Sequence, residues 1–251
     1  MATKEAITPE TKPDRLKMSY EAFLEWADED TYAEWDASTG EVIILMPPKN
    51  IHQVTLGFLY QLLDLFVRLF NLGKVGIAPF EVKLKPAGSS REPDIFFITN
   101  ENLARLTEDR LVGPADLMIE IISADSVHRD RHDKFKEYRE AGVREYWIVD
   151  PRPRKQRADF FRLDVAGEYE LFATEDDEWV ASPVLPGFRL RPAWLWQADT
   201  LNPLMCSLEI EGMAATLMQQ IQQASQPEQG SEGAAPTGGF AEPAPSGQEQ
   251  G

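Results

Sequence analysis

A regular repeat of apolar positions marks one long helix in the N-terminal half of the chain. Within residues 51–72, apolar side chains recur at spacings of three and four, as at Leu59, Leu62 and Phe66. Gly73 follows the last of them and is expected to cap the helix. An apolar stripe of this kind predicts a core helix that packs on a sheet.

Short apolar runs bounded by turn residues predict strands on both sides of this helix. The turn cluster at residues 36–40 separates two such runs and predicts a hairpin. Residues 117–122 (LMIEII) are apolar on both faces apart from one carboxylate, which is typical of a central strand covered on both sides. The predicted strands span residues 32–35, 41–46, 75–80, 81–85, 94–99, 117–122, 145–149, 159–163, 168–172 and 179–181.

The remaining helical segments are shorter. Ser19 can cap a helix that ends near residue 29. Further elements are predicted at residues 101–106, 129–141, 192–196 and 207–223. The helix at 129–141 lies between two strands with short connections, which predicts a right-handed crossover between parallel strands. Together these elements predict an α+β fold with a central mixed β-sheet flanked by helices.

Composition changes after residue 225. The segment 226–251 consists mostly of Gln, Pro, Gly, Ala, Ser and Glu, so it cannot bury enough surface to offset the entropy of ordering. We therefore predict four parts: a loose lead-in at residues 1–16, one domain at 17–200, an amphipathic C-terminal helix within 201–225, and a disordered tail at 226–251.

The chain is strongly acidic, since 25 Lys and Arg stand against 42 Asp and Glu and give a net charge of −17. The predicted tail holds only four of the acidic residues, so the acidity belongs mainly to the folded part. Such a charge disfavours a protein that coats nucleic acid by bulk attraction. Basic residues nevertheless cluster within 129–139 and 152–157, either as a strip that contacts phosphates or as an ordinary solvated face.

Other sequence features exclude several classes of protein. No apolar run approaches the ~18 residues of a membrane span, and the N-terminus lacks the apolar core of a secretory signal. Cys206 is the only cysteine, which excludes an intrachain disulfide and a cysteine-cluster zinc site. The sequence has no GxxxxGK[ST], GxGxxG or GxSxG motif. We predict a cytoplasmic protein with no membrane segment and no disulfide-linked partner.

Two carboxylates stand out because they occur where charge is costly. Glu120 lies in the strand that is apolar on both faces, where it either pairs with an Arg or lies near solvent at a strand end, or else serves a site. Asp94 opens the preceding predicted strand, where it is either a turn residue or a second member of that site. Two carboxylates on neighbouring strands form an oxygen-rich pocket suited to Mg²⁺.

A lysine and the histidines extend this candidate site. Asp130, Lys134 and Tyr138 are four residues apart and share one helix face, so Lys134 either points back at the pocket or is an exposed lysine. Carboxylates, a metal and a lysine together suit hydrolysis of a phosphodiester. His128 and His132 are four residues apart and either bind a metal or face solvent, which their positions favour. His52 is an additional candidate for the site: it either faces the pocket or, as its position favours, caps the long helix or lies at the surface.

The sequence resembles the Uma-type family of putative restriction endonucleases, which belongs to the PD-(D/E)xK nuclease superfamily. The resemblance covers about residues 18–200 and rests on pieces that occur in order: MSYEAFLEW at 18–26, Glu34-Trp35, Gly40-Glu41, His52-Gln53, REPD at 91–94, GPAD at 113–116, EIIS at 120–123, Lys134 with Tyr138, GVREYW at 142–147, VDP at 149–151 and PVLPG at 183–187.

The resemblance implies a restriction-endonuclease-like fold and assigns roles to several residues. Asp94 and Glu120 match the two carboxylates that bind the divalent metal in that superfamily, and the Ile121 carbonyl is a further candidate ligand. The superfamily lysine is expected two residues after Glu120, where Ile122 stands, so Lys134 on the following helix takes its place. Glu34 matches a recurring family glutamate, either as a metal ligand or water base or in a structural role.

The function expected from the sequence is hydrolysis of DNA by an endonuclease that depends on Mg²⁺ or Mn²⁺, with Asp94, Glu120 and Lys134 as its catalytic residues. A homodimer is a candidate assembly because cutting both strands usually needs two active sites, and the helix at 207–223 is a candidate contact. The alternative is a catalytically silent protein that keeps the fold as a binding or regulatory module.

Overall fold

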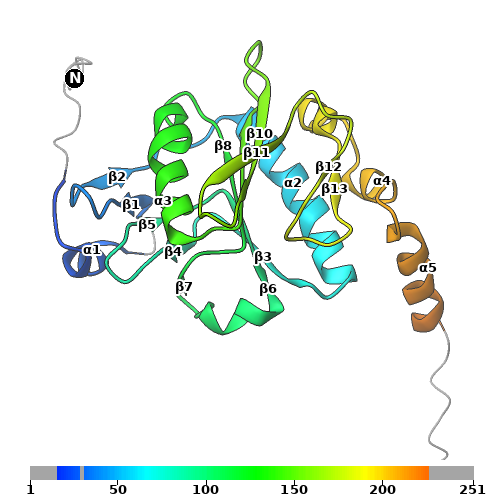
Figure 1. Ribbon diagram of the computed structural model, residues 1–251, viewed down its shortest axis with the longest axis horizontal. Helices are drawn as coiled ribbons and strands as arrows, with labels where there is room; N and C mark the ends of the chain where they lie inside the picture. The colour runs from blue at the N-terminus through cyan, green and yellow to red at the C-terminus, as the bar shows by residue number, and fades with distance from the viewer. Residues whose placement is uncertain (1–15, 29–30, 226–251) are drawn as a thin grey trace, which may run out of the picture.

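The computed structural model describes residues 16–28 and 31–225, and Figure 1 shows it as a ribbon. The predicted tail and nearly all of the predicted lead-in lie outside these residues, and the predicted boundaries of the domain stay predictions. The fold is α+β with mixed sheets flanked by helices, which confirms the predicted fold class.

A six-stranded mixed sheet forms the centre of the protein, with the order β11-β10-β9-β8-β6-β3. β8 and β9 are parallel neighbours joined through a helix, as the crossover pattern predicted. Every residue of β8 is buried, as expected for a central strand covered on both faces. The strands of this sheet are β3 (Gly73–Ile77), β6 (Ile95–Thr99), β8 (Leu117–Ile121), β9 (Glu145–Asp150), β10 (Arg157–Leu163) and β11 (Tyr169–Thr174).

A second sheet contains five short strands in the order β2-β1-β5-β4-β7. Its hairpin of β1 and β2 was predicted, whereas β5 and β7 were not, because runs of two or three residues carry no periodicity. The strands are β1 (Ala33–Trp35), β2 (Val42–Ile44), β4 (Glu81–Lys83), β5 (Ser90–Arg91) and β7 (Arg110–Val112). A two-stranded sheet of β12 (Val180–Ala181) and β13 (Arg189–Leu190) completes the strands.

Helices cover both faces of the central sheet. α2 packs on one face through the predicted apolar stripe, and α3 covers the other face, where Tyr138 joins a second apolar cluster (Figure 1). The helical elements are α1 (Tyr20–Trp26), α2 (Asn50–Leu69), η1 (Asn100–Arg105), η2 (Arg129–Asp133), α3 (Lys134–Ala141), η3 (Pro192–Gln197), α4 (Pro203–Ser207) and α5 (Met213–Ala224). Among the described residues, no helix is both long and apolar enough to span a bilayer.

Two predicted features differ in the structure. Gly73 does not cap α2, because the helix ends at Leu69 with Phe70 as its C-cap. Gly73 instead begins β3, where a Cβ would lie 2.0 Å from the carbonyl oxygen of Ile98. The helix predicted at 207–223 begins only at Met213, as α5, because Gly212 adopts a left-handed conformation (φ 82°), and the separate helix α4 ends at Ser207.

Candidate functional site

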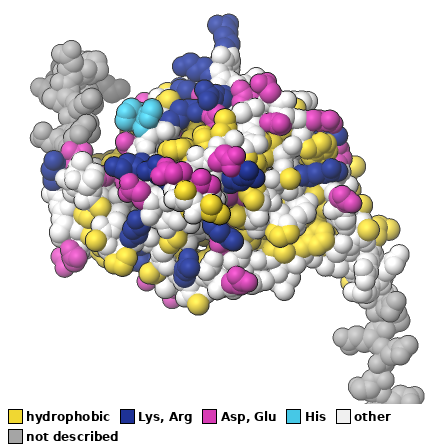
Figure 2. Space-filling view, viewed as in Figure 1, with side chains coloured by type: hydrophobic (Ala, Val, Ile, Leu, Met, Phe, Trp, Pro, Cys, Tyr) yellow, Lys and Arg dark blue, Asp and Glu magenta, His cyan; other side chains and the backbone are white. Residues whose placement is uncertain are grey.

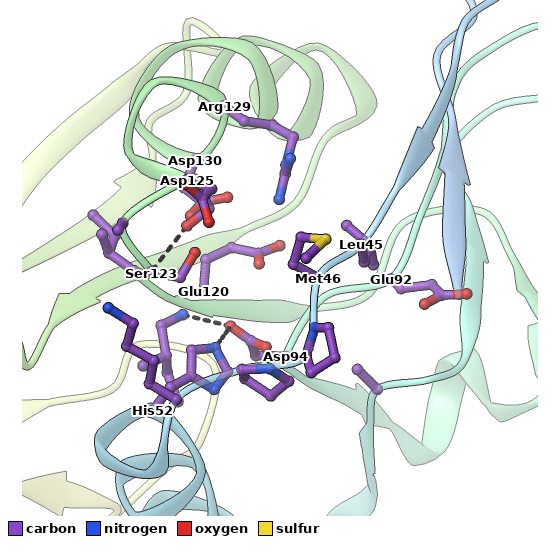
Figure 3. Close-up of a pocket in the computed structure, with 18 of the residues that line it drawn as sticks. Leu45, Met46, His52, Glu92, Asp94, Glu120, Ser123, Asp125, Arg129 and Asp130 are labelled. Atoms are coloured by element: carbon purple, nitrogen blue, oxygen red, sulfur yellow. Dashed lines mark hydrogen bonds and ion pairs between the residues drawn. The ribbon is translucent and has the colours of Figure 1, made fainter. Parts of the chain in front are cut away.

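A cavity of about 460 Å³ opens at the end of the central sheet where β8 finishes and β6 begins. Most of its walls come from the segment around β1 and β2, the start of α2, and the region from β8 through η2 to α3. Residues before β6, among them Glu92 and Asp94, and the turn after β9 with Arg152 complete the lining. Ligand sites in open sheets often form outside the carboxyl ends of the strands, which is where this cavity lies relative to β8. Figure 3 shows 18 of the residues that line it.

The structure brings the two predicted carboxylates to this cavity. β6 and β8 are antiparallel with Ile95 opposite Ile119, so Asp94 lies across from Glu120 one position further along. Glu120 is 3% exposed, and both residues line the cavity. Burial raises the pKa of Glu120 above its ordinary value, although the nearby ammonium group of Lys134 opposes this.

Lys134 is buried and faces the cavity, so it is not an exposed helix lysine. Its Nζ lies 2.9 Å from Glu120 Oε1 and 3.0 Å from Glu34 Oε1. Tyr138, one turn further along α3, donates a 2.6 Å hydrogen bond to Glu120 Oε1. Burial lowers the pKa of Lys134, but Glu120 and Glu34 outweigh it, and the pKa stands above its ordinary value. The amine is therefore protonated at neutral pH.

Glu34 comes from the second sheet and supplies the other partner of Lys134. It is 1% exposed, and Oε1 also accepts a 3.1 Å hydrogen bond from the backbone N–H of Glu92. Arg91 and Arg129 lie 3.6 and 3.7 Å from Oε2. Burial alone would raise the pKa of Glu34, but Lys134 and the two arginines lower it to about 2. Glu34 is therefore ionised, and together with Glu120 it fixes the position of the Lys134 amine.

His52 is not at the surface, and the expectation that it caps α2 or faces solvent was wrong. It is 7% exposed in the first turn of α2, and its Nε2 lies 3.1 Å from Asp94 Oδ2 (Figure 3). The sequence did not reveal this because the position depends on how α2 packs against the start of β6. His52 therefore helps to fix the orientation of Asp94.

The backbone of Ile121 completes the group around Asp94. Its N–H donates a 2.7 Å hydrogen bond to Asp94 Oδ2. This side-chain oxygen takes the place of a backbone partner, because the pairing of β6 with β8 begins only at Ile95 and Ile119. The N–H and C=O of one strand residue point to the same side of the strand, so the Ile121 carbonyl also faces the Asp94 side. Both side-chain contacts of Asp94 use Oδ2, which leaves Oδ1 as the oxygen available to a ligand.

Several buried carboxylate oxygens around the cavity lack a hydrogen-bond donor in the described part of the chain. Buried oxygens of Glu34, Glu92 and Asp130 accept no hydrogen bond from the described residues. Burial raises the pKa of Glu92 to about 8, and burial also raises the pKa of Asp130. An added cation would relieve this concentration of negative charge.

The donor set fits a hard divalent cation such as Mg²⁺ or Mn²⁺. Among residues 16–28 and 31–225, no three His, Cys, Asp or Glu side chains form a ready-made metal cage. Asp94, Glu120 and the Ile121 carbonyl instead offer two carboxylates and one backbone oxygen. Mg²⁺ is commonly held in this way, through one or two carboxylates with water and substrate phosphate as its other ligands.

The predicted basic strip is not a continuous surface, because most of its members pair with acids. Arg129 and Lys134 belong to the buried network, and Arg131 and Arg157 both contact Asp159. The turn between β9 and β10 still projects with exposed basic side chains at its tip (Figure 2). His128 is exposed beside His132, as expected, with ring centroids 4.8 Å apart.

Sequence reasoning missed several residues of the site. It did not single out Glu92, although it directly precedes the Pro-Asp pair, or Arg91, which is fully buried and also pairs with Asp36 and Glu137 at 2.7 Å. It also missed the apolar wall at residues 44–48. The REPD run of charges before an apolar strand was the available signal for Arg91 and Glu92.

Comparisons with known proteins identify the family and the fold of the chain. A family model described as Uma2, putative restriction endonuclease, matches residues 20–193. A solved structure, a putative nuclease belonging to DUF820 from Anabaena variabilis ATCC 29413, is similar with a TM-score of 0.58 and 17% sequence identity, over 71% of this chain and 97% of that one. At this identity the likeness shows a shared fold. A search of curated proteins finds no match.

Proposed function

Because the chain belongs to the Uma2 family of putative restriction endonucleases, we propose that it is a metal-dependent endonuclease that hydrolyses phosphodiester bonds of DNA. The observation that carries this proposal is the meeting of Asp94, Glu120 and Lys134 in one cavity, although they lie on different elements. Two carboxylates beside a buried ammonium group suit a phosphate that binds together with a divalent cation.

Each residue has a separate task in this proposal. Asp94, Glu120 and the Ile121 carbonyl would hold the cation, and His52 with the Ile121 N–H fixes Asp94. A cation bound there supplies Lewis-acid charge at the phosphate and lowers the pKa of a coordinated water. Glu34 and Tyr138 keep Lys134 and Glu120 in place through the contacts described above.

Lys134 acts through its charge rather than as a base. A lysine base must be neutral, whereas Glu120 and Glu34 hold the pKa of Lys134 above its ordinary value. The protonated amine can donate a hydrogen bond to a phosphate oxygen or orient the attacking water. The excess acid in the cavity repels a phosphate by itself, so activity should require the cation.

Cleavage of a supercoiled plasmid with Mg²⁺ or Mn²⁺ tests the proposal. We expect the wild type to nick or linearise the plasmid, and Asp94→Ala and Glu120→Ala to be inactive although folded. Asp109→Ala is a matched control, since Asp109 is exposed in a turn away from the cavity and should leave activity unchanged. A folded wild type that binds metal but cuts neither DNA nor RNA would overturn the proposed nuclease activity and favour the catalytically silent binding module. Equal cleavage by all four proteins would overturn the assignment of Asp94 and Glu120 to the active site.

A further inference from the structure

One wall of the cavity is apolar and faces outward, which the hydrolysis of a phosphodiester does not explain. Ile44, at the end of β2, is 58% exposed and Met46 is 70% exposed, and Ile51 at the start of α2 is 37% exposed. We call the cavity-lining residues Ile44, Leu45, Met46, Pro47, Pro48 and Ile51 the apolar rim. Leu45 and Met46 of the rim stand across the cavity from Glu120 and Asp130 (Figure 3).

The position of the apolar rim indicates a ligand with a flat apolar surface next to a phosphate. Keeping large apolar side chains in water is unfavourable, and exposed apolar patches commonly mark binding sites. Pro47 and Pro48 restrict the backbone of the rim, so little conformational entropy is lost when a ligand binds. The exposed side chain of Lys49 also lines the cavity and suits a phosphate next to such a ligand, whereas Arg152 is already paired with Asp150 at 2.7 Å.

In a paired duplex the faces of the bases are stacked on one another, and only their edges and the phosphates are accessible. Such a surface offers the apolar rim little to contact. An unstacked nucleotide exposes the face of its base, which proteins bind through aromatic and apolar side chains. A cavity of about 460 Å³ has the size of a site for a small molecule rather than for a double helix.

We propose that the apolar rim holds an unstacked base beside the scissile phosphate, so that the preferred substrate is DNA with unpaired nucleotides. This inference rests on the nuclease function proposed above. Met46 is the main contact, because it is the most exposed residue of the rim and projects into the cavity (Figure 3).

Binding to matched oligonucleotides tests the inference separately from cleavage. One labelled sequence is used as a single strand, as a fully paired duplex and as a duplex with a mismatched bubble, with Ca²⁺ in place of Mg²⁺. We expect the single strand and the bubble to bind about tenfold more tightly than the paired duplex. Met46→Ala should weaken bubble binding about three- to tenfold and leave duplex binding unchanged.

Met205→Ala is the matched control, since Met205 is 60% exposed on α4, outside the cavity, and its loss should change neither affinity. Equal affinity for duplex and bubble, or equal effects of the two methionine variants, would overturn the inference. Cleavage of paired DNA as fast as bubble DNA would also overturn it, while leaving the nuclease function intact. A preference for unpaired DNA that depends on Met46, without any cleavage, would keep the inference and overturn the nuclease function.

Discussion

Glu120 and Glu145 are both buried carboxylates on neighbouring parallel strands, yet their surroundings differ. Glu145 is the first residue of β9 and pairs with Leu117 at the start of β8, whereas Glu120 lies near the end of β8. Glu145 is 0% exposed. It accepts hydrogen bonds from Trp147 Nε1 and Ser182 Oγ, each of 2.6 Å, and from the Val184 N–H. Within the described residues it has no ion pair. Glu120 instead has a lysine, a tyrosine and an open cavity.

The comparison shows that burial alone does not mark a functional carboxylate. Glu145 is surrounded by neutral donors from a fixed part of the fold, so its position is structural. Glu120 lies where buried acidic oxygens remain without hydrogen bonds and where a ligand can enter. The distinguishing feature is unbalanced charge beside a cavity.

Exchanging each carboxylate for an amide of the same shape should separate the two roles most strongly. We expect Glu120→Gln to lower plasmid cleavage about a thousandfold while the protein stays folded, because a cation ligand becomes neutral. Glu145→Gln should retain activity within a few fold and lose about 1–3 kcal/mol of stability at pH 5, since its NH₂ group now faces a donor. Initial cleavage rates and chemical denaturation measure the two effects, and loss of activity in both variants would contradict the distinction.

Removing the buried ammonium group of Lys134 should destabilise the fold at neutral pH. Lys134→Met leaves Glu34 and Glu120 buried without their shared partner, which costs about 3 kcal/mol. Lys136→Met on the same helix is the matched control, because Lys136 is 68% exposed and its loss should change stability by less than about 0.5 kcal/mol. Urea denaturation compares the two variants, and equal midpoints would show that the buried network contributes nothing.

The two regions should also respond differently to pH. Burial raises the pKa of Glu145 to about 7 in the folded protein, against an ordinary value of 4.5. The stability from this group is present below about pH 4.5 and is lost as pH rises through 7, by about 3 kcal/mol at most. The penalty of Glu145→Gln should therefore be larger at pH 5 than at pH 8, and denaturation at both values measures it. A larger penalty at pH 8 would contradict the raised pKa.

Divalent cations should stabilise the end of the sheet that holds Glu120 and not the end that holds Glu145. At a concentration about ten times the dissociation constant, Mg²⁺ or Mn²⁺ adds about 1.4 kcal/mol to the folded state. Thermal denaturation should show a higher Tm with the cation and a return to the starting value with EDTA. The shift should persist in Glu145→Gln and vanish in Glu120→Gln; a shift that persists in both variants would place the cation elsewhere.

The sequence predicted best what depends on local periodicity. The apolar stripe of α2 and the two apolar faces of β8 were visible because each reports which side of an element is buried. The shared face of Asp130, Lys134 and Tyr138 was correct for the same reason, as all three are buried. Periodicity also indicated that Glu120 was an unusual residue in its strand.

Features that depend on contacts between distant segments could not be read in this way. The pairing of Glu34 with Lys134 requires the second sheet to dock on the first, and the contact of His52 with Asp94 requires the packing of α2. The apolar rim was missed because an apolar run after a strand resembles a continuation of that strand. Contacts of this kind are set by tertiary packing, which a local pattern does not contain.

The ion pair between Glu34 and Lys134 bears on when the candidate site is assembled during folding. Asp94 and Glu120 lie on adjacent strands and close to each other in the sequence, whereas Glu34 and Lys134 are 100 residues apart. Closing a longer segment costs more chain entropy, and non-local contacts tend to form late. We therefore expect Asp94 and Glu120 to come together before Lys134 pairs with Glu34. A partly folded chain would then hold the two carboxylates in place while the amine of Lys134 is still loosely positioned, so the proposed nuclease activity would arise only when the two sheets dock.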